Sequence, residues 1–218
     1  MKSYKGIILD LDRTLWDFEK NSRAELSRIF QRNDLGSFGL NENEFIEYYI
    51  HINELLWSQF RNGEIIHSEI RSRRFKEVLL NFGVESDVLA AQINQEYIDE
   101  CPKNGDLFEG VEEWLRERRE QGVKLYIASN GLQEIQEIKL SSTGILNLFE
   151  GVFCSNIIGA TKPHKAFFDY ILRRIDLPVS ELCYLGDEVE VDGKAAEAVN
   201  MDFYLVENGK LNELCIKF

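Results

Sequence analysis

The sequence predicts an α/β protein in which a doubly wound parallel sheet is interrupted, after its first strand, by an all-helical insertion. Two observations lead to this prediction. Short apolar runs alternate with helical patterns in the second half of the chain, as in βα units. After the first apolar run, by contrast, only helical patterns are found as far as residue 104. The length of 218 residues is sufficient for such a domain with a second lobe.

Five apolar runs mark the expected strands. Each run is short and continuous rather than alternating with polar residues, which is typical of strands buried on both faces. We expect strands at residues 6–9, 123–128, 151–154, 182–185 and 203–206. We expect the helices that accompany them at residues 110–120, 132–142, 165–175 and 194–199. Because strands and helices alternate, the sheet should be parallel.

Four helical patterns fill the insertion. They predict helices at residues 22–31, 42–60, 68–81 and 87–100. Asn41, with Glu44 three residues later, is typical of a helix N-terminus. Gly83 is typical of the stop that follows a helix C-terminus. The insertion is therefore expected to be a helical lobe.

The borders of this lobe follow from the same patterns. Pro102 and Gly105 mark a turn at the end of the last helix of the insertion. We therefore divide the chain into an α/β core, residues 1–15 and 105–218, and a helical cap lobe, residues 16–104. The chain has no Pro- or Ser-rich linker, so we expect the cap to be docked and hinged.

Composition limits the kinds of partner that the protein can bind. The formal net charge of -13 disfavours the backbone of nucleic acids, which demands a surplus of lysine and arginine. No stretch approaches the roughly 18–20 consecutive apolar residues of a membrane span. Asp10 comes too early for the apolar region of a secretory signal. We expect neither nucleic acid polymers nor membranes as partners, and the oligomeric state stays open.

The four cysteines indicate a reducing compartment. Cys101, Cys154, Cys183 and Cys215 are widely separated and contain neither a CxxC pair nor a spacing typical of zinc sites. Cys154 and Cys183 lie in apolar runs, where we expect buried and inert thiols. A cytoplasmic protein is therefore expected.

An acidic pair follows the first expected strand. Asp10 and Asp12 are two residues apart, so in an extended chain both carboxylates point the same way, and Thr14 follows them. Two neighbouring carboxylates repel each other unless a cation or a proton intervenes. The pair therefore suits metal binding or a division of acid and base roles, although the same residues could form a solvated turn.

Polar residues also follow three later strands. Ser129 and Asn130 precede a helix, where a hydroxyl and free N–H groups suit a phosphate. Lys162 could bring a positive charge, and Asp187 and Asp192 belong to an acidic run that suits Mg²⁺. Alone, these residues could equally be a helix cap, a surface lysine and a solvated loop. Ligands bind beyond the carboxyl ends of parallel strands, so their joint placement predicts one site.

These motifs resemble those of the haloacid dehalogenase-like hydrolases, which have a Rossmann-like core. The resemblance covers nearly the whole chain and rests on a helical cap and on four motifs: DLDRT (Asp10–Thr14), Ser129-Asn130, Lys162-Pro163 and GDEVEVD (Gly186–Asp192). Within this family, the residues after Thr14 and the acidic run look most like the pyrimidine 5'-nucleotidase branch.

The resemblance implies a role for each acidic residue. Asp10 would be the nucleophile that forms an aspartyl-phosphate. Asp12 would protonate the leaving group and later deprotonate the attacking water. Mg²⁺ would be held by Asp10, by the backbone carbonyl of Asp12 and by Asp187, with Asp192 orienting a bound water.

The resemblance also implies how the substrate is held. The phosphoryl oxygens would contact Thr14, Ser129, Asn130 and Lys162. Trp16 and Phe18, where the cap begins, are candidates for contact with a nucleobase, although packing would explain them equally well. Arg13 and Glu188 depart from the residues common in the family and could change the charge around the metal.

The function implied is that of a Mg²⁺-dependent phosphomonoesterase acting on a small metabolite, with a nucleoside 5'-monophosphate as the leading substrate. A sugar phosphate or phosphoglycolate phosphatase is the nearest alternative. A 2-haloacid dehalogenase needs neither Mg²⁺ nor a second acid, so Asp12 and the acidic run disfavour it. A signalling receiver that stores an aspartyl-phosphate has no use for the acid pair or for the helical lobe.

Overall fold

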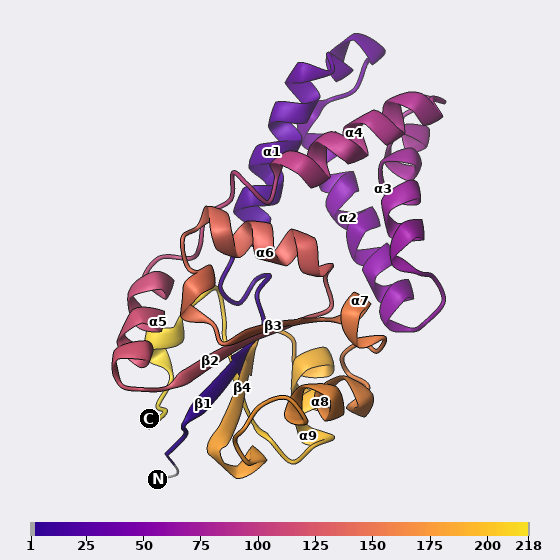
Figure 1. Ribbon diagram of the computed structural model, residues 1–218. Coiled ribbons are helices and arrows are strands. Elements are labelled where there is room, and N and C mark those ends of the chain that lie inside the picture. The colour runs from indigo at the N-terminus through magenta and orange to yellow at the C-terminus, as the bar shows by residue number, and fades with distance from the viewer. Residues whose placement is uncertain (1–2, 218) are drawn as a thin grey trace. The chain divides into compact units, whose positions relative to one another are not determined.

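The structure is a computed structural model that describes residues 3–217. The chain forms two compact units (Figure 1). The α/β unit consists of the chain up to Glu19 and of the chain from Gly105 onward, and the helical unit is Lys20–Asn104. A parallel sheet flanked by helices confirms the predicted fold class.

Five strands build the sheet of the α/β unit. They are β1 (Gly6–Leu9), β2 (Lys124–Ser129), β3 (Gly151–Cys154), β4 (Leu182–Gly186) and β5 (Asp202–Leu205). Their order is β3-β2-β1-β4-β5, and every neighbouring pair is parallel. Leu9, the last residue of the central strand, is opposite Ile127 of β2 and Leu185 of β4. All five carboxyl ends therefore lie along one edge of the sheet.

Helices cover both faces of this sheet, which explains why its strands are continuous apolar runs. The helices on these faces include α5 (Val111–Glu120), α6 (Gln133–Ser142), α8 (Lys165–Leu172) and α9 (Lys194–Glu197). Figure 1 shows α5 and α6 on one side of the sheet and α8 and α9 on the other. Phe167 and Phe168 of α8 are fully buried and belong to one core cluster with Ile8 and Tyr184. Burial of each such side chain stabilises the fold by roughly 1.5–3 kcal/mol.

Local structure differs from expectation around the later strands. The helix predicted at 165–175 ends at Leu172. A short helix, α7 (Ser155–Ile158), follows β3 directly, and a π-helical turn, Val189–Gly193, follows β4. Neither was predicted, because a single turn of helix leaves no hydrophobic periodicity in the sequence.

The helical unit consists of the four predicted helices. They are α1 (Phe18–Arg32), α2 (Glu42–Arg61), α3 (His67–Asn81) and α4 (Asp87–Glu100). The Asn41 side chain accepts a hydrogen bond from the backbone N–H of Glu44 at 3.2 Å and caps α2 as expected. Buried aromatic side chains of α2, α3 and α4 meet in its interior, with the ring of Tyr49 5.0 Å from that of Phe75 and 5.2 Å from that of Tyr97. This aromatic cluster is the core of the unit.

Two further expectations concern the chain as a whole. Among residues 3–217, no helix combines the length and the apolar character needed to cross a membrane. The four cysteines are free thiols, of which Cys101, Cys154 and Cys183 are buried and Cys215 is exposed. The expected burial of Cys154 and Cys183 is therefore confirmed.

Candidate active site

The central strand β1 places Asp10 at the carboxyl edge of the sheet. Ser129 ends β2 on one side of β1, and Asp187 follows β4 on the other. The backbone N–H of Asp10 donates to Leu185 O at 2.9 Å, so the parallel pairing continues up to the candidate nucleophile. The order of the strands thus brings motifs far apart in sequence to one place, as predicted.

Lys162 donates hydrogen bonds to several side chains of the site. Its buried Nζ donates to Asp10 Oδ1 at 2.6 Å, to Asp192 Oδ1 at 2.8 Å and to the hydroxyl of Tyr184 at 2.8 Å. Burial disfavours the charged ammonium, but the carboxylates of Asp10 and Asp192 outweigh this effect and raise the pKa of Lys162 above its usual value. Lys162 is therefore a permanent cation placed between two carboxylates.

Asn130 holds the backbone of Lys162 in place. Its Nδ2 donates to Lys162 O at 3.0 Å, and its Oδ1 accepts from Lys162 N at 2.8 Å. The backbone carbonyl of Asn130 in turn accepts from Ser155 Oγ at 2.8 Å. The side-chain amide of Asn130 is thus engaged in fixing the loop of Lys162, and contact of Asn130 with the phosphate stays a prediction.

Three carboxylates gather beside this lysine. Asp10, Asp187 and Asp192 each offer an oxygen, and these oxygens lie within 4.8 Å of one another. Burial, reinforced by the charges of Asp192 and Asp187 and opposed by Lys162, raises the pKa of Asp10 well above its usual value. Burial and the nearby Asp192 raise the pKa of Asp187 to about 6. One ammonium is therefore not enough to compensate the three carboxylates.

This donor set fits a divalent cation. Mg²⁺ prefers carboxylate oxygens, and a cation among these three groups would offset their mutual repulsion. Asp10 and Asp187 are the better placed for direct contact. Asp192 is engaged elsewhere, since its Oδ1 accepts from Lys162 and Tyr184 and its Oδ2 accepts from Glu188 N at 3.2 Å. The Thr14 hydroxyl, which was expected at the phosphate, donates to Asp187 Oδ1 at 3.3 Å.

The raised pKa of Asp187 predicts pH-dependent cation binding. Below about pH 6 the metal-free protein holds a proton on Asp187 that Mg²⁺ must displace, so Mg²⁺ affinity should fall as pH falls through that value. In the metal-free protein the native state binds more protons than the unfolded chain between the usual and the raised pKa, so its stability should decrease as pH rises through this range. Thermal unfolding with and without Mg²⁺ at about pH 5 and about pH 8 measures both effects. An equal stabilisation by Mg²⁺ at both pH values would contradict the assignment, and Asp169→Asn, at a surface acid paired with Lys165, is the control.

Asp12 is held separately from the three carboxylates. Lys139 Nζ donates to its Oδ1 at 2.5 Å, and Gln136 Nε2 donates to its Oδ2 at 2.8 Å. Gln136 Nε2 also donates to Ser129 Oγ at 2.8 Å, and Gly131 N donates to the same hydroxyl at 3.0 Å. Ser129 accepts in both contacts, so its own proton is available for a phosphoryl oxygen.

The residues that follow the acid pair have two different environments. Arg13 adopts a left-handed backbone (φ 67°), donates to Glu19 Oε1 at 3.1 Å and lies over the ring of Phe18, 5.0 Å from its centroid. Trp16 is fully buried, and its ring lies so close to Gly105 that a Cβ there would be 2.1 Å from Cζ2. The burial favours a packing role for Trp16, whereas Phe18 is partly exposed and stays a candidate for substrate contact.

Three residues of the site were not predicted from the sequence. Tyr184 lies within β4, and its hydroxyl donates to Asp192 Oδ1 at 2.7 Å. Gln136 and Lys139 lie on α6 and contact Asp12. Both occupy the helix stripe that also contains Leu140, and polar residues on an otherwise buried stripe were the signal that could have identified them.

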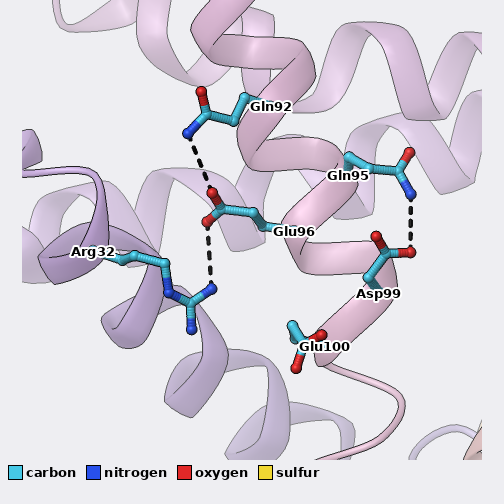
Figure 2. A pocket seen from close by; sticks show the side chains of 6 residues that line it. All are labelled: Arg32, Gln92, Gln95, Glu96, Asp99 and Glu100. Carbon is cyan, nitrogen blue, oxygen red and sulfur yellow. Dashed lines mark hydrogen bonds and ion pairs between the residues drawn. The ribbon is translucent and has the colours of Figure 1, made fainter.

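The helical unit has a pocket of its own. Figure 2 shows Arg32 of α1 opposite the acidic and amide side chains of α4, with Glu96 Oε2 3.5 Å from Arg32 Nη1 and Gln92 Nε2 3.2 Å from Glu96 Oε1. The described lining residues are Arg32, Gln92, Gln95, Glu96, Asp99 and Glu100. None of them is a predicted site residue.

Comparison with known proteins places these observations in a family. The sequence matches the family model for haloacid dehalogenase-like hydrolases over residues 7–206. It is 27% identical to the Bacillus subtilis protein YfnB, which carries a HAD-hydrolase name, over 93% of this chain and 83% of that protein. It is 26% identical to the pyrimidine 5'-nucleotidase PynA of Streptococcus pneumoniae, over 91% and 82% of the two chains. It is 28% identical to the glyceraldehyde 3-phosphate phosphatase of Methanocaldococcus jannaschii, over 96% and 88%.

Solved structures agree with these sequence matches. One solved structure is a crystal structure of YfnB of Bacillus subtilis bound to magnesium, which reveals interdomain movement in that protein. It superimposes with a TM-score of 0.84 at 27% identity, over 93% of this chain and 88% of that chain. The L-2-haloacid dehalogenase PA0810 superimposes with a TM-score of 0.71 at 18% identity, over 94% and 86% of the two chains. The second likeness shows the fold alone.

Proposed function

The chain belongs to the haloacid dehalogenase-like hydrolases, and on that premise we propose that it is a Mg²⁺-dependent phosphomonoesterase acting on a nucleoside 5'-monophosphate. One observation carries the proposal. Asp10 accepts a hydrogen bond from the buried Lys162 and lies beside Asp187 and Asp192, while Asp12, two residues on, is held by a different set of donors. A nucleophile beside a cation site and a separate acid and base is what transfer of a phosphoryl group requires.

In the first step, a carboxylate oxygen of Asp10 attacks phosphorus. The bond between phosphorus and the leaving oxygen breaks, and Asp12 gives its proton to that oxygen. Lys162 and the hydroxyl of Ser129 would hold the phosphoryl oxygens while charge develops on them. Bound Mg²⁺, held by Asp10, Asp187 and the backbone carbonyl of Asp12, would supply further positive charge to these oxygens.

In the second step, water attacks the aspartyl-phosphate on Asp10. Asp12, now a carboxylate, takes a proton from this water as the new bond to phosphorus forms. The bond between phosphorus and Asp10 then breaks, and the carboxylate of Asp10 and inorganic phosphate are released. Each group returns to its starting state, so the cycle is balanced.

We assign the helical unit the role of a cap that excludes bulk water and large polymers during this cycle. The proposed cap is residues 16–104, which include the helical unit Lys20–Asn104, and the proposed core is residues 1–15 and 105–218. The assignment of a cap supports a small phosphate monoester, rather than a nucleic acid polymer, as the substrate. The free thiols suit a cytoplasmic protein.

Two relatives support a nucleotide substrate, and a third supports a sugar phosphate as the alternative substrate. PynA and the Escherichia coli protein YjjG, 28% identical over 85% of this chain, are pyrimidine 5'-nucleotidases. The glyceraldehyde 3-phosphate phosphatase is equally similar, so a sugar phosphate is the second candidate. The three-carboxylate group and the second acid, Asp12, argue against a dehalogenase on the same fold.

A panel of phosphate monoesters tests the proposal. With Mg²⁺ present, kcat/KM for pyrimidine nucleoside 5'-monophosphates should exceed that for triose and pentose phosphates by at least about tenfold, since that ratio needs only about 1.4 kcal/mol of differential binding. Release of inorganic phosphate is the readout, and protein treated with EDTA is the control. A preference for sugar phosphates would show that the protein is a sugar phosphate phosphatase instead. Release of chloride from a 2-haloacid without metal would overturn the phosphatase assignment itself.

A further inference from the structure

Two polar side chains lie on the buried face of α6, and no general requirement of the fold explains them. Gln136 is 1% exposed and Lys139 is 6% exposed. Burial of an amide or an ammonium costs free energy unless hydrogen bonds and opposite charge compensate it. Apolar residues at these positions would pack the helix onto the sheet without that cost. The groups to which Gln136 and Lys139 donate hydrogen bonds therefore indicate the role of the two side chains.

Both side chains direct their donors to the same carboxylate. Lys139 Nζ reaches Asp12 Oδ1 at 2.5 Å, and Gln136 Nε2 reaches Asp12 Oδ2 at 2.8 Å. Each oxygen of Asp12 therefore has its own donor, which fixes both the position of the carboxylate and the rotation of its plane. We name this pair, Gln136 and Lys139, the α6 clamp.

The α6 clamp is itself anchored within the α/β unit. Gln136 Nε2 also donates to Ser129 Oγ at 2.8 Å, so one amide group ties Asp12 to the end of β2. Lys139 Nζ lies 4.4 Å from the centroid of the Trp16 ring, a cation–π contact with a fully buried side chain. The Gln136 Oε1 atom is buried without a hydrogen-bond partner, so the side-chain hydrogen bonds of this amide are those of its Nε2.

We infer that Gln136 and Lys139 are positioning residues that hold the Asp12 carboxyl group at the leaving oxygen of the substrate. The inference rests on the proposed function and deepens it. Asp12 has a side chain that is 30% exposed, whereas that of Asp10 is 10% exposed and bonded to Lys162. Without the clamp, Asp12 would be free to change rotamer, and proton transfer demands a donor within about 2.6–3.2 Å of its acceptor.

The test compares two substrates that differ in how much they need the acid. An alkyl phosphate has a poor leaving group that must be protonated as it departs, whereas 4-nitrophenyl phosphate has a leaving group that departs as an anion. Lys139→Met and Gln136→Leu should lower kcat/KM for the alkyl ester by about tenfold or more and for the aryl ester by much less. The ratio of the two kcat/KM values does not depend on the fraction of folded enzyme, so it is the decisive readout.

Two matched variants control for the substitutions. Gln133→Leu changes a glutamine of the same helix that donates to Glu137 instead, and Lys165→Met changes an exposed lysine paired with Asp169. Both should keep the wild-type ratio. Lys139→Arg, which retains a cationic donor, should restore part of the activity towards the alkyl ester and decides the matter if Lys139→Met fails to fold.

The outcomes separate the inference from the proposed function. An equal loss for both esters in Lys139→Met and Gln136→Leu would show a merely structural role and overturn the inference, while the phosphatase would stand. Full activity of both variants towards the alkyl ester would overturn it as well. A wild-type protein without Mg²⁺-dependent phosphatase activity would remove the proposed function, and the inference with it.

Discussion

Asp10→Asn is expected to lower kcat for phosphate release by at least about 10⁴-fold, because an amide oxygen cannot form the aspartyl-phosphate and no other group replaces a missing nucleophile. The substitution is nearly isosteric, and Lys162 keeps a carboxylate partner in Asp192 at 2.8 Å. The pKa of Asp10 is raised chiefly by burial, so removal of its charge should leave the metal-free protein at least as stable as the wild type.

Two measurements check this expectation. Steady-state kinetics on the best substrate of the panel give the loss of activity, and thermal unfolding shows that the fold is kept. Acid quench of the wild type during turnover should trap phosphate on the protein, and the same quench of Asp10→Asn should trap none. The control is Asp169→Asn, which removes a carboxylate outside the site. Retention of Mg²⁺-dependent turnover by Asp10→Asn would show that the nucleophile is another group.

Lys162→Met is expected to reduce both stability and activity. The change leaves the carboxylates of Asp10 and Asp192 buried without their common cation. Loss of one partner of a buried ion pair typically costs about 3–5 kcal/mol of unfolding free energy. The deficit should be smaller at about pH 5 than at about pH 8, because the uncompensated carboxylates take up protons as pH falls. Urea unfolding at the two pH values measures it.

A second substitution separates the two effects of Lys162→Met. Adding Asp192→Asn removes one of the unpaired carboxylates, so the double variant should regain part of the lost stability. Activity should not return, because the phosphoryl oxygens still lack the Lys162 ammonium. Mg²⁺ should stabilise Lys162→Met more than it stabilises the wild type, since the cation adds positive charge to the same cluster. Wild-type stability of Lys162→Met would show that Lys162 does not compensate these carboxylates.

The sequence predicted those parts of the molecule that depend on local patterns. The five strands were recognised because strands of a parallel sheet are buried on both faces and therefore read as short continuous apolar runs, and β1 and β3 were placed with their observed ends. The helices of the insertion were recognised by their periodicity, and α2 by its Asn41 cap as well. Asp10, Lys162, Asp187 and Asp192 were expected together because the ends of parallel strands meet at one edge.

The parts that the sequence did not predict depend on contacts between distant residues. Tyr184 reads as one more apolar residue of β4, and only the approach of Lys162 and Asp192 gives its hydroxyl a role. Lys139 is 127 residues from its partner Asp12, so no local pattern links the two. Asn130 was expected at the phosphate because a helix follows it, but no local pattern links its side-chain amide to the backbone of Lys162, 32 residues away.

Because β1 is the central strand, the two side chains that donate to Asp12 and the two carboxylates that accompany Asp10 follow strands on opposite sides of it. Asp12 depends on α6, which follows β2, whereas the cation site with Asp10 depends on Asp187 and Asp192, which follow β4 on the opposite side. In the proposed mechanism, proton delivery to the leaving group and affinity for the cation therefore depend on different segments of the chain. Substitutions in the segment after β2 are expected to change the first property and substitutions in the segment after β4 the second, so that a change of leaving group would not require a change in the proposed cation site.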